Sequence, residues 1–312
     1  MWDYDKTDAD DLCGTVTVDF DDLLNEMMPG APTRYKNYFW ANVYGAPMVG
    51  TSGNFENKMN ADPRLASYWR GRVLLSLQVV ENEKPKLCAQ KINDPQLKNL
   101  VLEQFDSGAP FETRCQVFSG ACLPCPGKQL KVMMRWGNQE AVTALQNNTN
   151  GNCEWYENMK RKLINTPSDN IADLPDIFVY LMLEDTIVSY LRMRPAECTD
   201  VQGKAKWLQL IPDKSTKKAG EDWEGGFVRI RFYIGKYDEE NDDLKIGGWA
   251  TKPVKPAAGS KLLLVNLFQC RNLPAADPTG KADPYVKITC GATTVMTGKE
   301  EKMNNLNPVR DK

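Results

Sequence analysis

Hydrophobic and polar residues alternate along much of this chain with the two-residue period of a β-strand. The alternation is cleanest in residues 227–234 (FVRIRFYI), where Arg229 and Arg231 are expected to face away from a core. Residues 177–182 and 187–193 flank a short acidic turn and predict a hairpin. Other segments rich in β-branched or aromatic residues are also predicted as strands: 15–20, 38–44, 72–80, 115–118, 130–136, 261–268 and 285–289. The fold class is therefore mainly β with a small helical part.

The helical part is expected within residues 138–165, interrupted by the polar run 147–152 (NNTNGN). Trp155, Met159 and Leu163 recur at every fourth position, with basic residues between them. This spacing is typical of a surface helix that packs one apolar face on a core.

Two stretches differ in composition from the predicted strands. Residues 48–66 are polar and rich in turn-forming residues, and residues 248–260 are rich in Pro, Ala and Lys, so both are predicted as linkers. No apolar run approaches the 18 residues typical of a membrane-spanning helix.

Composition excludes several functions. The chain contains no histidine, which rules out Ser-His-Asp and Cys-His catalysis and histidine-ligated zinc. A formal net charge of −2 argues against a general nucleic-acid binder, because attraction to polyanions needs a basic excess. A basic group at Lys214, Lys217 and Lys218 could contact lipid, although such groups are more often solvated loops.

Nine cysteines are spread over the chain, an odd number that argues against a secreted disulfide framework. Cys115, Cys122, Cys125 and Cys153 could form a four-thiolate zinc site, but their first gap is wide for a zinc knuckle. Reduced cytosolic thiols are the alternative interpretation.

Acidic residues crowd the first part of the chain, with nine carboxylates against one lysine in residues 1–26. Calcium takes six to eight oxygen ligands, and clustered carboxylates on a loop can supply them. A solvated acidic terminus would have the same composition. At the other end, Asp277 and Asp283 bracket a glycine-containing turn before a predicted strand.

These two ends resemble the calcium loops of C2 domains. Residues 277–288 resemble the first calcium loop, in which one aspartate lies in the loop and another directly precedes Pro-Tyr-Val. Residues 305–309 (NLNPV) resemble a later C2 turn, and residues 2–14 resemble the other calcium loop. The ligands that the resemblance implies are Asp3, Asp5, Asp11, Asp277 and Asp283, together with the less well matched Asp10.

Other stretches are similar to ferlins. Residues 39–47 (FWANVYGAP), 68–77 (YWRGRVLLSL) and 130–138 (LKVMMRWGN) occur in ferlin order, and residues 174–194 resemble the core of the Ferlin B-domain. The resemblance implies C2-type antiparallel β-sandwich pieces flanking an α+β region like the Ferlin B-domain. The implied boundaries are a C-terminal C2 part at 1–47, a linker at 48–66, a ferlin-type β segment at 67–140, a Ferlin B-domain-like region at 141–247, a linker at 248–260, and an N-terminal C2 part at 261–312.

The resemblance implies a non-enzymatic membrane-trafficking protein that recruits calcium and anionic phospholipid in vesicle fusion, exocytosis or membrane repair. We expect it to act peripherally on the cytoplasmic side of membranes, with trafficking proteins as further partners and no nucleic acid. We also expect a piece of a longer parent, of a family in which many members have a tail anchor. Calcium should bind well in that parent, whereas the two incomplete C2 parts should bind it weakly. A calcium-independent protein-interaction scaffold and an enzyme that its C2 domain targets to membranes remain as alternatives.

Overall fold

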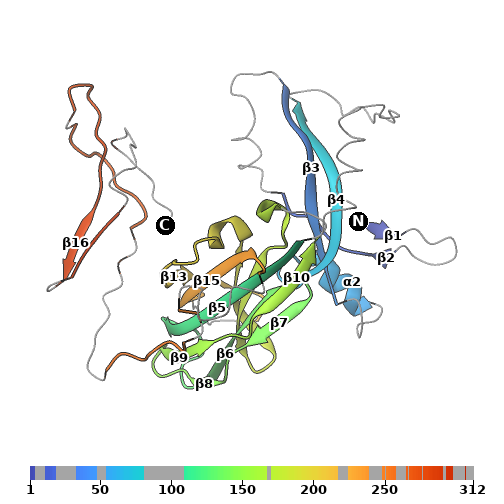
Figure 1. Ribbon diagram of the computed structural model, residues 1–312, viewed down its shortest axis with the longest axis horizontal. Coiled ribbons are helices and arrows are strands. Elements are labelled where there is room, and N and C mark those ends of the chain that lie inside the picture. The colour runs from blue at the N-terminus through green and yellow to red at the C-terminus, as the bar shows by residue number, and fades with distance from the viewer. Residues whose placement is uncertain are drawn as a thin grey trace. The chain divides into compact units, whose positions relative to one another are not determined.

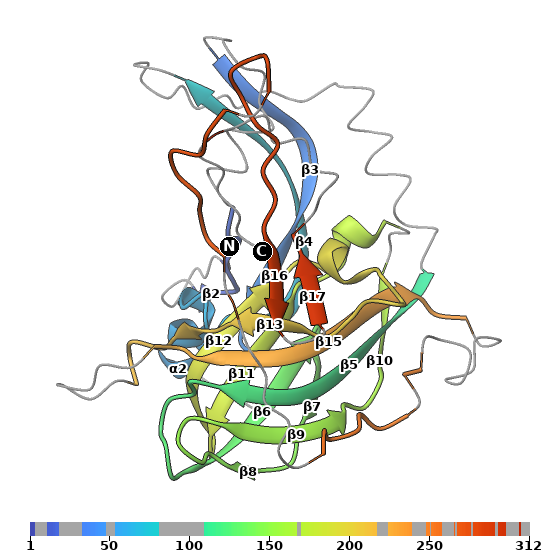
Figure 2. The same cartoon turned by 90° about the vertical axis from the view of Figure 1, so that its left-hand side faces the viewer.

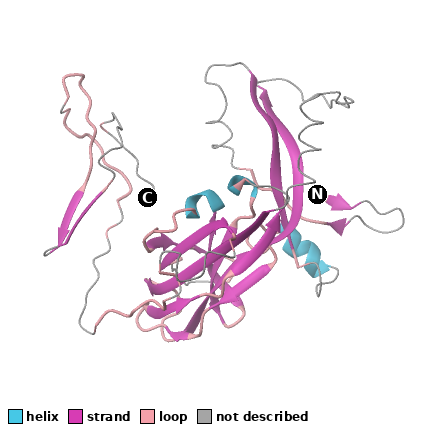
Figure 3. Cartoon of the chain, in the orientation of Figure 1, coloured by secondary structure: helices cyan, strands magenta, loops and turns pink. Residues whose placement is uncertain are grey.

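The computed structural model describes residues 1–3, 11–18, 33–47, 54–80, 109–166, 170–216, 224–238, 248–249, 251–257, 265, 267–275, 277–290, 293–297 and 306. The chain divides into two compact units, Met1–Lys255 and Pro256–Lys312. Half of the residues that the structure describes are in strands and 6% are in helices, which confirms the mainly β class (Figure 3). The finer domain boundaries stay predictions.

Two antiparallel sheets form a β-sandwich in the first unit (Figures 1 and 2). The five-stranded sheet has the order β10 (Lys162–Thr166), β5 (Ala109–Ala121), β15 (Phe227–Lys236), β13 (Lys206–Gln209), and β9 (Cys153–Asn158) also pairs with β5. The six-stranded sheet has the order β14 (Ile211–Pro212), β12 (Thr186–Met193), β11 (Ile177–Leu183), β6 (Gln129–Trp136), β7 (Gln139–Val142), and β8 (Gln146–Asn147) also pairs with β6.

The predicted alternation of β15 is confirmed. Val228, Ile230 and Phe232 point into one hydrophobic cluster that includes residues of both sheets. Arg229 and Arg231 are only partly buried, as expected for residues on the outer face. The period of two in the sequence therefore reports the pleat of a strand that is buried on one side.

The apolar run of β11 has a different cause, because both faces of this strand are covered. Ile177, Val179 and Leu181 belong to the core between the sheets. Phe178 and Tyr180 belong to a second cluster that also contains Tyr44, Ala66 and Trp69 from earlier in the chain. The predicted hairpin of β11 and β12 is confirmed, and Glu184 in its turn has a φ of +54°.

The earlier part of the chain forms a ribbon of two long antiparallel strands, β3 (Thr33–Gly45) and β4 (Tyr68–Val80) (Figure 2). Helix α2 (Asn54–Ala61) lies within the interval predicted as a linker. Two short strands, β1 (Trp2–Asp3) and β2 (Asp11–Leu12), pair with each other. Of the strand predicted at 15–20, Thr15 forms only an isolated bridge with Tyr44 and residues 16–18 are not in a strand, while residues 19–20 lie outside the described residues.

The helix predicted within residues 138–165 is wrong, since β7, β8, β9 and β10 occupy this stretch. Trp155 and Met159 are both buried in the sandwich core. A spacing of four residues equals two pleats of a strand as well as about one helical turn, so it could not separate the two structures. The described helical segments are α2 and two 3-10 turns, η1 (Ile171–Asp173) and η2 (Pro195–Cys198).

The second unit contains one described strand pair, β16 (Lys287–Cys290) and β17 (Thr293–Met296). The strand predicted at 285–289 is therefore found, with a slightly later start, while most of residues 261–268 lie outside the described residues. Val295 and Met296 are exposed, and Ala282 is the buried apolar residue among those described in this unit.

Candidate functional site

The acidic residues at the start of the chain, within residues 1–26, are called the first acidic segment here. Two of them, Asp3 and Asp11, lie on the paired strands β1 and β2. Asp3 and Asp11 are direct partners across this antiparallel pair. Side chains in such positions have Cβ atoms about 5 Å apart, and two like charges there destabilise the pair. Two of the five predicted ligands of the chain thus lie side by side, while Asp5 and the less well matched Asp10 lie outside the described residues.

Two asparagines of α2 hold the second strand of this pair. The side chain of Asn57 accepts a hydrogen bond from the backbone N–H of Leu12 at 3.1 Å and donates one to Asp11 Oδ1 at 3.4 Å. The buried side chain of Asn60 donates to the carbonyl of Leu12 and accepts from the N–H of Ala46 at 2.5 Å. The helix therefore fixes the position of the strand that carries Asp11.

The second acidic segment is a tight turn in the second unit. The N–H of Gly280 donates to the carbonyl of Asp277 at 3.0 Å, and the N–H of Asp277 donates to the carbonyl of Lys281 at 3.0 Å. Gly280 has a φ of +75°, a conformation that favours glycine. The side chains of Asp277 and Asp283 are both exposed on this turn.

These carboxylates do not form a complete calcium ligand set by themselves. Within the described ranges, no three Asp, Glu or Cys residues come close enough to share a metal ion. Calcium needs six to eight oxygen ligands, so carbonyls, water or residues outside those ranges would have to complete either site.

The zinc alternative does not fit the described cysteines. Cys115 and Cys153 are buried in the sandwich core, whereas Cys122 is exposed on a loop. Burial raises the pKa of the Cys153 thiol to about 11, and it raises the pKa of Cys115 strongly as well. Zinc binds thiolates, and these two side chains remain neutral thiols near pH 7.

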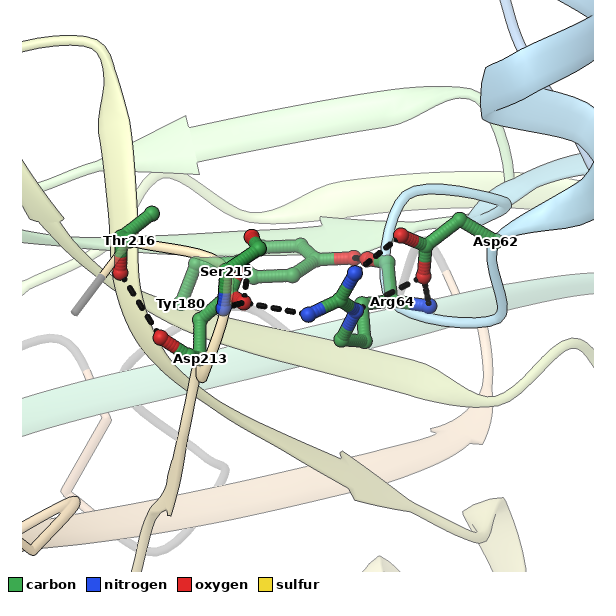
Figure 4. A network of polar contacts seen from close by, with 6 residues as sticks. All are labelled: Asp62, Arg64, Tyr180, Asp213, Ser215 and Thr216. Atoms are coloured by element: carbon green, nitrogen blue, oxygen red, sulfur yellow. Dashed lines mark hydrogen bonds and ion pairs between the residues drawn. The ribbon is translucent and has the colours of Figure 1, made fainter. Parts of the chain in front are cut away.

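An ionic network that the sequence did not predict connects the turn after α2 to the sandwich (Figure 4). The guanidinium of Arg64 forms ion pairs with Asp62 and with Asp213, which follows β14. Asp213 also accepts hydrogen bonds from the N–H and hydroxyl of Ser215 at 2.9 and 2.7 Å. The hydroxyl of Tyr180 donates to the carbonyl of Arg64 at 2.8 Å. The hydrogen bond from Arg64 is the main cause that lowers the pKa of Asp62.

A second network lies nearby on the outer face of the six-stranded sheet. Arg135 donates to Glu140 Oε1 at 2.9 and 2.6 Å, and its guanidinium lies 3.9 Å from the ring centre of Tyr68. The hydroxyl of Tyr68 donates to the same carboxylate at 2.5 Å. Burial, and then this hydrogen bond, raise the pKa of Tyr68 to about 12. Burial alone would raise the pKa of Glu140, but Tyr68 and Arg135 outweigh it and lower this pKa.

A third network joins Tyr44, near the end of β3, to the outer face of the six-stranded sheet. Arg192 donates to Asp176 at 2.6 Å, and its guanidinium lies 4.9 Å from the ring centre of Tyr44. The N–H of Asp176 donates to the hydroxyl of Tyr44 at 2.7 Å. Together, these three networks fix Tyr44 and residues 62–68 on the sandwich. Helix α2, which directly precedes residue 62, in turn holds the strand that carries Asp11.

Comparison with known proteins gives a partial classification. Residues 261–310 match the C2 domain family. No curated protein matches the chain significantly. Within the described residues, no helix is both long and apolar enough to cross a membrane.

Several solved structures resemble parts of the chain. A single C2 domain of a plant extended synaptotagmin 1 is 14% identical over 41% of this chain and 96% of its own, with a TM-score of 0.29. A calcium-bound extended synaptotagmin 2 with two C2 domains is 13% identical over 44% and 48%, with a TM-score of 0.30. PLC21 of L. pealei is 12% identical over 43% of this chain but only 17% of its own, with a TM-score of 0.31. TM-scores of this size carry no functional inference. The class that the fold and the family match define is a mainly β protein containing a C2-domain segment.

Proposed function

We propose that this chain is a membrane-associating module of a ferlin-like trafficking protein, in which C2 segments bind calcium and anionic phospholipid. The match of residues 261–310 to the C2 domain is the observation that carries the proposal. It agrees with the exposed carboxylates of Asp277 and Asp283 on one glycine-containing turn.

Electrostatics suggest how these acidic segments would respond to a cation. Asp3 and Asp11 face each other across a strand pair, so their charges repel each other and also repel an anionic lipid surface. Bound calcium would supply positive charge between these carboxylates and lipid phosphates. Asn57 and Asn60 would meanwhile keep Asp11 in place, which lowers the ordering cost of binding.

Co-sedimentation with vesicles tests this proposal. The chain should bind phosphatidylserine vesicles in the presence of calcium, release them when a chelator is added, and bind less as ionic strength rises. Phosphatidylcholine vesicles serve as the control for charge. Binding to anionic vesicles that is equally strong with and without the chelator would contradict the calcium-dependent function.

A second function, a calcium-independent interaction scaffold, is favoured by the incomplete metal sites. The described ranges contain no group of three candidate ligands. In contrast, three polar networks join the sandwich to Tyr44, Arg64 and Tyr68, as a rigid scaffold requires. Replacing both Asp277 and Asp283 with Asn discriminates the two functions. Membrane localisation that survives this double substitution favours the scaffold.

The ferlin assignment adds finer expectations to this proposal. They are roles in vesicle fusion, exocytosis or membrane repair, trafficking proteins as partners, a peripheral position on the cytoplasmic side of membranes, and the domain boundaries given above. The resemblance of residues 174–194 to the Ferlin B-domain supports them. Pull-down of trafficking proteins by the full chain would test the partner role, and the capture of no such protein would contradict it.

A further inference from the structure

A recess opens at the edge of the sandwich core, between β13, β15 and the 3-10 turn η2. Its volume is about 150 Å³. The recess belongs to neither acidic segment, and the membrane function proposed above does not use it.

The floor of the recess is apolar. Ile230, Phe232 and Cys198 are buried members of the sandwich core, and Met193 and Leu208 pack against that core. Apolar cavities of about this size accept molecules as large as benzene. The floor therefore suits an apolar group of about six carbon atoms.

Cys198 contributes to this apolar character. Burial, and after it the neighbouring carboxylate of Glu197, raise the pKa of its thiol to about 12, against a smaller opposing effect of Lys206. The side chain is therefore a neutral thiol near pH 7, and such a thiol behaves as a small hydrophobic group.

The rim of the recess is charged, in contrast to its floor. Two carboxylates and two ammonium groups surround it, from Glu197, Asp200, Lys204 and Lys206. All four side chains are exposed, and Asp200 Oδ1 accepts a hydrogen bond from the N–H of Gln202 at 2.9 Å. The rim can thus receive one positive and one negative group of a ligand at the same time.

The outer lip of the recess is held in place before any ligand binds. The N–H of Gly203 donates to the carbonyl of Asp200 at 2.9 Å and closes a turn. Arg231 donates to the carbonyls of Gly203 at 2.5 Å and Val201 at 3.1 Å, and the indole of Trp249 also donates to Val201 at 3.1 Å. A lip fixed in this way lowers the entropy that binding would cost.

We propose that this recess binds a small zwitterion with an apolar side chain, of the size and chemistry of a free apolar α-amino acid. The apolar side chain occupies the floor. The carboxylate of the ligand lies towards Lys204 and Lys206, and its ammonium group lies towards Glu197 and Asp200.

Methyl NMR of the full chain, labelled at its methionines, tests this inference with leucine as the probe. Met193 lines the recess, whereas Met133 lies on the outer face of the six-stranded sheet and serves as an internal control. A ligand with nine heavy atoms is expected to bind with a Kd of about 1 mM. Leucine should then shift the Met193 signal saturably and leave that of Met133 unchanged.

Three related probes and three variants sharpen the test. Glycine lacks the apolar side chain, 4-methylpentanoate lacks the ammonium group, and isoamylamine lacks the carboxylate, so each should bind at least about tenfold more weakly than leucine. The double substitution Lys204→Glu with Lys206→Glu changes exposed positions and should also weaken leucine binding about tenfold. Lys128→Glu changes an exposed residue between β5 and β6 that does not line the recess, so it should not. Leu208→Trp should fill the recess and abolish the shift.

Any of three results would overturn the inference. They are the absence of a Met193 shift at leucine concentrations well above the expected Kd, an equal response to glycine or to a singly charged probe, and leucine binding that survives the double lysine substitution.

Discussion

The attachment of residues 62–67 to the sandwich can be tested by replacing Arg64 with Met. This side chain forms ion pairs with Asp62 and Asp213, whose own side chains are 16% and 5% exposed. The substitution leaves the carboxylate of Asp213 buried without its cation. Breaking a buried ion pair costs about 3–5 kcal/mol.

Two features of the structure reduce that cost. Asp213 retains hydrogen bonds from the N–H and hydroxyl of Ser215, and the side chain of Arg64 is itself 27% exposed. We therefore expect Arg64→Met to lower the free energy of unfolding by about 2–3 kcal/mol. Arg64→Lys keeps the charge but loses the two-pronged geometry, and it should cost about 1 kcal/mol.

Urea unfolding followed by far-ultraviolet circular dichroism measures these differences. Arg229→Met is a matched control, because this arginine lies 5.2 Å from the ring centre of Phe118 and should cost less than about 1 kcal/mol. A double-mutant cycle of Arg64→Met with Asp213→Asn should give a coupling energy of about 1–2 kcal/mol. A loss below about 0.5 kcal/mol for Arg64→Met, or strictly additive effects in the cycle, would refute the reasoning.

Three further predictions concern the outer face of the six-stranded sheet. The pKa of Glu140 is lowered in the folded chain, so this carboxylate stabilises the fold above its ordinary pKa of 4.5, and the stabilisation is lost as the pH falls through the folded pKa. Glu140→Gln should therefore flatten the acid limb of a plot of stability against pH, and an unchanged limb would argue against this role. Burial raises the pKa of Tyr180 to about 12, so its neutral phenol stabilises the fold below its ordinary pKa of 10.0, and this stabilisation is lost as the pH rises towards 12. Tyr180→Phe should make the stability less sensitive to alkali, which the midpoints of urea unfolding across that pH range would reveal. Phe178 lies between Tyr44 and Tyr180 and is only 2% exposed. Phe178→Ala should lower the free energy of unfolding in urea by about 3–5 kcal/mol, whereas a loss below about 1 kcal/mol would mean that the cluster around Phe178 is loosely packed.

The alternation of apolar and polar residues was enough to predict a strand wherever only one face of that strand is buried, as in β15. It also predicted β11 as a strand, but it could not reveal that Tyr44, Ala66 and Trp69 cover the second face of that strand. For Trp155 and Met159 the spacing itself was ambiguous, because residues four positions apart lie on the same face of a strand and of a helix. The sequence pattern therefore led to a wrong prediction of a helix there.

The long-range polar contacts had no local signal. Arg64 and Asp213 are 149 positions apart, and Asn57 reaches Asp11 across 46 positions. Only the fold brings these side chains together. In contrast, the turn that carries Asp277 and Asp283 could be predicted, because its glycine and its aspartates are neighbours in the sequence.

The proposed function depends most directly on coupling between calcium and anionic lipid at the aspartates of the C2 segment. Calorimetric titration of calcium into the full chain, with and without phosphatidylserine vesicles, measures this coupling, because each ligand must raise the affinity for the other. We predict that the vesicles raise the apparent calcium affinity about tenfold or more, and that the double substitution of Asp277 and Asp283 by Asn removes this gain. A calcium affinity that is unchanged by the vesicles, or a gain that persists in the double variant, would contradict the account.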